Sequence, residues 1–151
     1  MKNIFLMIIV LFLNSCGFTP IYSSKDSNYK IISFKKNINN NLTNYIQDSI
    51  RMLSNDSAEN VLKIDFNYSE DIIVILKDSK GDPKENRLTI NVDLKLFDVN
   101  DNLISSQKFF ENFEYSIDDN KFNLKQYEKN IKQNIVEEIT QQINAFLAQA
   151  T

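Results

Sequence analysis

Residues 88–96 alternate strictly between apolar and polar side chains. The apolar positions are Leu88, Ile90, Val92, Leu94 and Leu96, and the positions between them are Thr89, Asn91, Asp93 and Lys95. Because successive side chains of a strand point to opposite faces, this segment predicts a strand with one buried face and one hydrated face. Such a strand belongs to a sheet whose apolar side is covered by a second layer.

Other segments supply the rest of the sheet and its cover. Strands are predicted at residues 30–34, at the alternating residues 62–68 with a continuation or repeat at 72–76, and at residues 103–115. Apolar positions three and four residues apart predict helices at residues 41–53 and 124–147, with Ser54, Asn55 and Asp56 as the stop of the first. An asparagine caps the first helix, and Asn123 with Gln126 resembles a capping box for the second.

The order of these elements predicts the fold class. A strand and a helix precede three meandering strands and a closing helix, with a charged loop at residues 77–86 and a turn at 98–102. We expect an α+β two-layer sandwich, a sheet of about four mainly antiparallel strands with two helices packed on one face. The other face of the sheet stays polar or meets a partner.

Composition excludes several classes of function. The chain has 151 residues, a formal net charge of −3, one cysteine, two glycines and no histidine. Without histidine there is no Ser-His or Cys-His catalysis, and two glycines do not build a phosphate-binding loop. The acidic balance argues against nucleic acid as a partner, and the paired carboxylates lack metal-ligand spacing. We therefore expect no enzyme, no cofactor and no metal.

The N-terminus combines a short apolar run with the only cysteine of the chain. Lys2 precedes an apolar run at residues 4–13, which is followed by Asn14, Ser15 and Cys16. In a helix that run would rise only about 15 Å, which is too short to span a bilayer and fits a signal peptide better than a buried core helix. Residues 13–16 resemble the lipobox of bacterial lipoproteins, whose cysteine is acylated with chains such as palmitate. A free secreted thiol is the alternative for this cysteine.

This resemblance implies a division of the chain. Residues 1–15 are the predicted signal peptide, residues 16–29 the lipidated N-terminus and tether, and residues 30–151 a single domain. Gly17 follows the cysteine where an aspartate would retain a lipoprotein in the inner membrane. The resemblance therefore implies a lipid anchor at Cys16 on the periplasmic side of the outer membrane.

A second resemblance covers nearly the whole mature chain. Cys16-Gly17-Phe18-Thr19-Pro20-Ile21-Tyr22 is similar to the start of the lipopolysaccharide-assembly lipoproteins of proteobacteria. The element order is similar too, as are Arg87-Leu88 entering a strand, Leu96-Phe97-Asp98 leaving it, and Tyr115-Ser116-Ile117 before the final helix. The resemblance implies a non-enzymatic partner of the β-barrel that inserts lipopolysaccharide, aiding its assembly and the delivery of lipopolysaccharide to the outer leaflet.

The same resemblance implies contact with lipopolysaccharide, whose lipid A phosphates require cations. The candidates in or beside the charged loop are Lys77, Lys80, Lys84 and Arg87, with Lys77 first because it follows a strand directly. The alternative for these residues is an ordinary solvated loop, since Asp78, Asp82 and Glu85 offset their charge. Phe97 and Phe110 are candidates for exposed contact with the barrel.

Two other functions fit the same sequence. A small scaffolding lipoprotein of another envelope machine, such as the barrel-assembly complex, would need the same lipobox and a similar sandwich. A soluble lipid carrier would need an apolar pocket between the sheet and the helices.

Overall fold

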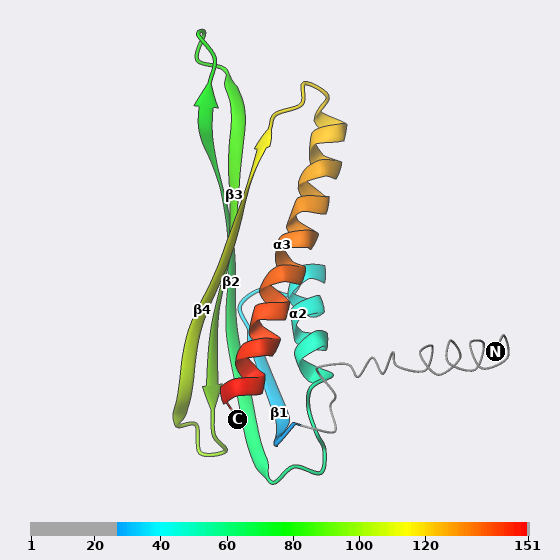
Figure 1. The fold of residues 1–151 in the computed structure, drawn as a ribbon, viewed down its shortest axis with the longest axis vertical. Coiled ribbons are helices and arrows are strands. Elements are labelled where there is room, and N and C mark those ends of the chain that lie inside the picture. Colours follow the sequence, from blue (N-terminus) through cyan, green and yellow to red (C-terminus); the bar gives the residue numbers. More distant parts are fainter. Residues whose placement is uncertain (1–26, 151) are drawn as a thin grey trace, which may run out of the picture.

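The computed structural model describes residues 27–150 as one sheet covered by two helices (Figure 1). Along the chain the elements are β1 (Tyr29–Lys36), α2 (Asn41–Arg51), β2 (Asn60–Lys77), β3 (Pro83–Phe97), β4 (Leu103–Ser116) and α3 (Lys121–Ala150). The strands lie in the order β1-β2-β3-β4; β1 is parallel to β2, and the other neighbours are antiparallel. The predicted α+β two-layer sandwich is confirmed.

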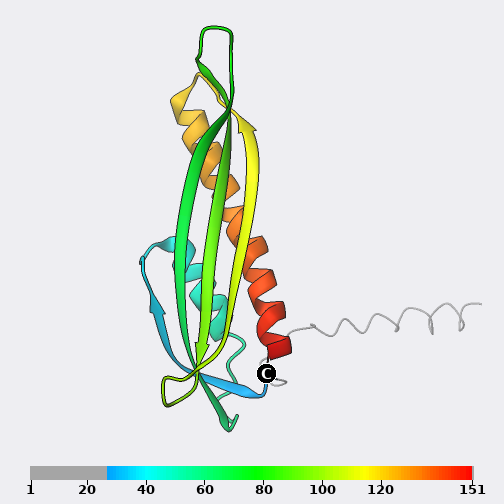
Figure 2. The same ribbon diagram turned by 90° about the vertical axis from the view of Figure 1, so that its left-hand side faces the viewer.

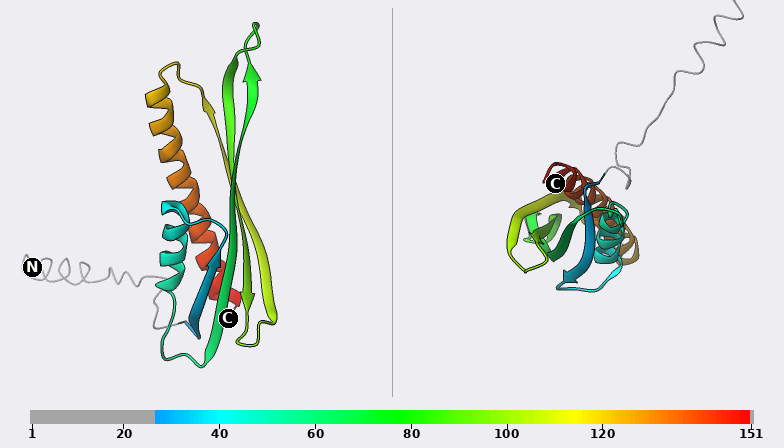
Figure 3. Two further views of the ribbon diagram at one scale, coloured as in Figure 1. Left: turned by 180° about the vertical axis from the view of Figure 1, so that it is seen from behind. Right: turned by 90° about the horizontal axis from the view of Figure 1, so that it is seen from below.

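Both helices cover the same face of the sheet, as the views from behind and from below show (Figure 3). The alternating apolar residues of β3 all point into this layer, since Leu88, Ile90, Val92 and Leu94 are 0% exposed. Phe66 of β2, Phe109 of β4, Ile46 and Ile50 of α2 and a stripe on α3 also belong to the core. The α3 stripe comprises Ile131, Ile135, Ile139, Ile143 and Leu147, each at most 5% exposed. Among the described residues, no helix is both long and apolar enough to cross a membrane.

The hairpin between β2 and β3 is longer than the sequence predicts. β2 is one strand of 18 residues, and only residues 78–82 form the turn, so the predicted loop at 77–86 was wrong at Lys77 and beyond Asp82. Lys84, Glu85 and Asn86 belong to β3, where Asn86 pairs with Val74. These residues are polar because both faces of the hairpin are accessible to solvent at this end. The strand therefore lacks the apolar alternation that would distinguish it from a loop in the sequence.

An asparagine caps each helix, but only at the first helix is the predicted start correct. Asn40 caps α2: its Oδ1 accepts from Thr43 N at 2.9 Å, and Thr43 Oγ1 accepts from Asn40 N at 3.0 Å. The helix ends at Arg51, before the predicted stop. α3 begins at Lys121, where Asn120 Oδ1 accepts from Phe122 N at 3.0 Å, so the predicted capping box at Asn123 was wrong. Asn120 and Asn123 are both residue types that cap helices, and Asn120 does so here because the helix begins before Asn123.

β1 covers only the lower half of β2, as Figure 2 shows for the strand drawn in blue. Their pairing runs from Tyr29–Asn60 to Lys36–Phe66. Beyond it, the side chain of Asn37 takes the place of a strand. Its Nδ2 donates to the Tyr68 carbonyl and its Oδ1 accepts from the Tyr68 amide, each at 2.9 Å. The upper part of β2 is therefore an edge of the sheet.

Candidate functional site

The predicted cations lie on the hairpin formed by β2 and β3, which projects at the end of the molecule opposite to the start of β1 (Figure 1). Lys77 ends β2, Lys80 lies in the turn and Lys84 follows the first residue of β3. The pairing of Lys77 with Pro83 brings these three positions together. Arg87 lies further along the hairpin, opposite Ile73, and is not part of the same group.

The turn itself is organised by Asp78. Its Oδ1 accepts from the amides of Lys80 and Asp82, both at 2.9 Å, and Gly81 adopts a positive φ of 90° that favours glycine. The hydrogen bonds from the Asp82 and Lys80 amides, with help from the Lys84 ammonium, hold the pKa of the Asp78 carboxyl below its usual value. This carboxylate is therefore charged at neutral pH and offsets the lysines around it.

Two of the four cations are already paired. Lys84 Nζ lies 3.7 Å from Asp78 Oδ2, and Arg87 Nη2 lies 2.6 Å from Glu114 Oε1. Within residues 27–150, Lys77 and Lys80 have no ion-pair partner. A new anion would reach these two lysines without displacing a carboxylate.

Apolar side chains are exposed directly below these cations. Ile72, Ile73, Val74 and Leu76 are 41–50% exposed. Five consecutive apolar residues, 72–76, thus run along β2 up to Lys77. The hairpin end combines cations with exposed hydrocarbon, the two features by which a surface binds an amphiphile with anionic headgroups.

A second group of cations was missed at the sequence level. Lys125, Lys129 and Lys132 of α3 line a hollow of about 290 Å³ together with Asn41 and Leu42 at the start of α2. Lys132 Nζ is held by Glu70 Oε1 at 2.7 Å. The spacing of four and three residues places these lysines on one helix face and could have identified them as a group. Their position beside α2 depends on the tertiary fold.

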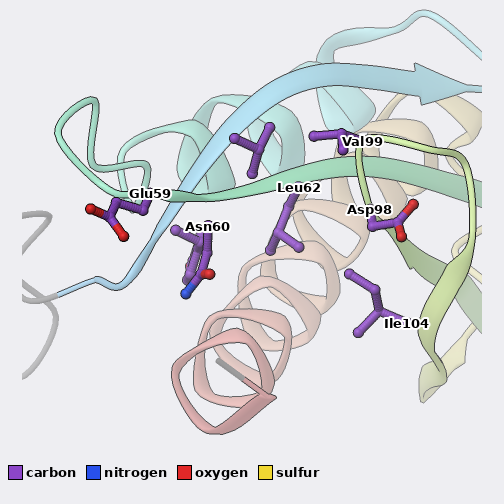
Figure 4. A pocket seen from close by; sticks show the side chains of 8 residues that line it. Glu59, Asn60, Leu62, Asp98, Val99 and Ile104 are labelled. Carbon is purple, nitrogen blue, oxygen red and sulfur yellow. The ribbon is translucent and has the colours of Figure 1, made fainter.

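Another hollow, of about 420 Å³, lies at the end of the molecule opposite to the β2–β3 turn. Figure 4 shows the side chains that line it. Leu62, Val99 and Ile104 form its apolar wall, while Glu59 and Asp98 add carboxylates. It lies beside the β3–β4 turn and the starts of β1 and β2. The layer between sheet and helices, where a lipid carrier would need its pocket, is instead occupied by the core side chains.

The remaining candidates separate into described and undescribed residues. Phe110 is 58% exposed on the polar face of the sheet, opposite Asn91, whereas Phe97 is half-buried. Within the described part of the chain no group of acidic or sulfur ligands could hold a metal ion. Cys16, the predicted signal peptide and most of the predicted tether lie outside the described residues.

Solved structures of bacterial lipoproteins have a similar fold. A minor lipoprotein from Acinetobacter baumannii is 17% identical with a TM-score of 0.63, covering 82% of this chain and 93% of the other. Lipoprotein B from Nitrosomonas europaea is 14% identical with a TM-score of 0.61, covering 89% and 94%. Rare lipoprotein B from Shewanella oneidensis is 13% identical with a TM-score of 0.58, covering 80% and 98%. At these identities the likeness establishes the fold.

The family follows from the sequence model that the chain matches. No curated protein sequence matches the chain. The model of the LptE family, described as lipopolysaccharide-assembly, matches residues 21–147, which include all six helices and strands except the end of α3. The chain belongs to the LptE family, non-enzymatic envelope lipoproteins that act in lipopolysaccharide assembly.

Proposed function

We propose that this lipoprotein is anchored in the outer membrane, on its periplasmic side, and partners the β-barrel that inserts lipopolysaccharide. In this role it aids assembly of the barrel and delivery of lipopolysaccharide to the outer leaflet, without catalysing a reaction. The observation that carries the proposal is the family match over residues 21–147, directly after a lipobox-like segment that ends at Cys16.

The anchor gives a physical reason why a small domain suffices. We propose that residues 1–15 are removed, that Cys16 is acylated, and that residues 16–29 link the lipid to the domain at 30–151. Several acyl chains give stable anchoring, since each buried methylene contributes about 0.8 kcal/mol. Confinement at the membrane surface raises the effective concentration of the domain near a barrel in the same membrane, so a modest contact surface holds it there.

Lipopolysaccharide would meet the cations at the hairpin end. Lys77 and Lys80 are the first residues to consider because both are free of carboxylate partners within the described chain. Lys84 and Arg87 would have to exchange Asp78 and Glu114 for a phosphate. The exposed residues Ile72 and Val74 would lie against acyl chains of the same molecule.

Co-purification tests the partner. The full chain with a C-terminal tag is extracted from envelopes in mild detergent, and the proteins recovered with it are identified by mass spectrometry. We expect a large outer-membrane barrel together with lipopolysaccharide. Recovery with the barrel-assembly machinery, and without that barrel, would overturn the proposal in favour of the scaffolding alternative.

The anchor has its own experiment. Intact-mass measurement of the mature protein should give an N-terminus at Cys16 carrying acyl chains, and Cys16→Ser should abolish both acylation and cleavage at this site, so that the chain keeps its apolar N-terminal run and is not recovered with the outer membrane. A mature chain that begins elsewhere, or an unmodified thiol at Cys16, would disprove the anchor while leaving the family assignment unaffected.

Lipopolysaccharide binding is tested with matched pairs of lysines. Binding of purified lipopolysaccharide to the full chain in detergent is measured for Lys77→Ala/Lys80→Ala and for Lys125→Ala/Lys129→Ala. Loss of the two unpaired hairpin cations should weaken binding about tenfold or more, the effect of about 1.4 kcal/mol. A loss confined to the α3 pair would move the binding site to the hollow beside α2. Unchanged binding in both variants would remove these cations from the mechanism.

A further inference from the structure

The hollow of about 420 Å³ beside the β3–β4 turn has apolar walls that remain open to solvent. Figure 4 shows its two sides, with Leu62 from the start of β2 and with Val99 and Ile104 from the turn and the start of β4. Val99 and Ile104 are 53% and 51% exposed. Exposed hydrocarbon around a hollow of this size is typical of a site that another apolar group covers.

The chain enters the described domain at this hollow. Tyr29, the first residue of β1, lines it, and so does Asn60, its partner in β2. Asn55 fixes the approach of the chain. Its Nδ2 donates to the Ser27 carbonyl at 3.0 Å, and its backbone amide donates to the Tyr29 carbonyl at 2.9 Å. The segment ahead of Ser27 therefore starts within about 7 Å of a residue that lines the hollow.

This segment carries apolar side chains within reach of the hollow. Phe18, Ile21 and Tyr22 precede Ser27 by nine, six and five residues. At most about 18 Å of extended chain thus separates Tyr22 from Ser27, so the segment is long enough to turn back onto the hollow. The family match begins at Ile21, eight residues before β1, so the pattern of the family includes this part of the segment.

The charges are arranged so that none has to enter the hollow. Lys25 and Asp26 are the only charged side chains of residues 16–26, and both follow the apolar part. Asp98 on the wall already accepts from the amides of Asn100 and Asn102, each at 2.8 Å. Glu59, the other carboxylate of the hollow, has no ion pair within residues 27–150. It is available to Lys25 at the rim.

We propose that Ile21 and Tyr22 seat in this hollow against Leu62, Val99 and Ile104. The chain's own segment is favoured over a second copy or a free amphiphile because its attachment makes the contact intramolecular, at an effective concentration in the millimolar range. Docking would leave only five residues between Cys16 and Ile21, at most about 18 Å of chain. This end of the domain would then be held near the membrane. That last consequence rests on the proposed anchor, whereas the docking itself does not.

Disulfide trapping in the full chain, purified in detergent, tests the docking. Ser23→Cys/Val99→Cys places one thiol beside the docked residues and the other on the wall of the hollow. Ser23→Cys/Ile32→Cys is the matched control: Ile32 is similarly exposed, at 51%, and only five residues from Ser27, but does not line the hollow. The hollow pair should link at least tenfold faster than the control pair. Val99→Cys alone gives the baseline for any contribution of Cys16.

A further variant separates docking from mere proximity. Adding Ile21→Ser/Tyr22→Ser to the hollow pair should slow the linkage about tenfold, because the apolar side chains that hold the segment are gone. Circular dichroism confirms that each variant is folded. Equal rates for the hollow and control pairs, or a rate indifferent to the loss of Ile21 and Tyr22, would overturn the proposal. So would linkage between two chains, which would assign the hollow to a second copy. Linkage is measured by intact mass without lipopolysaccharide or the barrel, so a negative result would leave the proposed function standing.

Discussion

Leu88 and Ile72 form a matched pair for testing the helix layer. They are direct partners across β3 and β2 and lie on the same face of the sheet. Leu88 is 0% exposed on an inner strand, whereas Ile72 is 41% exposed on the edge. Replacing either residue by alanine removes three carbons from almost the same place. The two positions differ in their cover by the helices and in the second neighbouring strand, β4, which flanks only Leu88.

The expected losses can be worked from this burial. Three fully buried carbons contribute about 2.4 kcal/mol of transfer free energy, and a cavity that cannot collapse adds about 1–2 kcal/mol. We expect Leu88→Ala to lower the free energy of unfolding by about 3–4 kcal/mol. At Ile72 about six-tenths of the transfer term applies, and water fills the space, so Ile72→Ala should cost about 1.4 kcal/mol. The two variants should therefore differ by about 2 kcal/mol.

Urea unfolding of the full chain, followed by circular dichroism at 222 nm, measures both losses. Two losses within about 0.5 kcal/mol of each other would refute the reasoning. Such a result would mean that the helices cover β2 and β3 equally at this level of the sheet.

Three further predictions follow from single contacts. Asn37→Ala should cost about 1–2 kcal/mol and speed hydrogen exchange at the Tyr68 amide, because both backbone groups of Tyr68 lose their partner; unchanged exchange would contradict this. Burial raises the pKa of Tyr29 to about 12. The folded chain therefore keeps a proton that the unfolded chain releases near pH 10, so stability should hold below that pH and fall between pH 10 and 12. The free energy of unfolding, measured with urea at several pH values, gives the slope of that fall. Tyr29→Phe should reduce this slope by up to about 1.4 kcal/mol per pH unit, and an unaltered slope would count against the prediction. Arg87→Ala should cost less than about 1 kcal/mol, because the ion pair with Glu114 is solvent-exposed. A double-mutant cycle with Glu114→Ala should give a coupling that shrinks in high salt, and a salt-independent coupling would argue against an exposed pair.

The sequence predicted those elements whose pattern is set by burial on one face. The alternation at residues 88–96 identified β3 and its core face, and the α3 stripe from Ile131 to Leu147 identified the closing helix. Polar strands gave no such signal. Lys84, Glu85 and Asn86 continue β3 only because β2 lies opposite them, and that pairing is not visible in a local window.

The candidate site was only partly predictable for a similar reason. The four cations and their proximity in sequence could be read directly. The nearby carboxylate that pairs with Lys84, Asp78, could be read as well. The partner of Arg87 could not, because Glu114 lies on another strand, 27 residues away. The α3 lysines could be grouped by their spacing, but the helix start that lies against them is brought there by the crossover from β1 through α2 to β2.

The parallel pairing of β1 with β2 has a mechanical consequence. β1 begins at Tyr29, at the end of the molecule opposite to the hairpin (Figure 1), and its pairs with β2 run upward from there to Lys36. A pull on the chain at residue 27, directed away from the domain along the strands, would load all of these pairs at once in shear. Such an arrangement resists force better than one in which hydrogen bonds break one after another. If the chain is tethered ahead of β1, the domain is built to stay folded while its anchor is under tension.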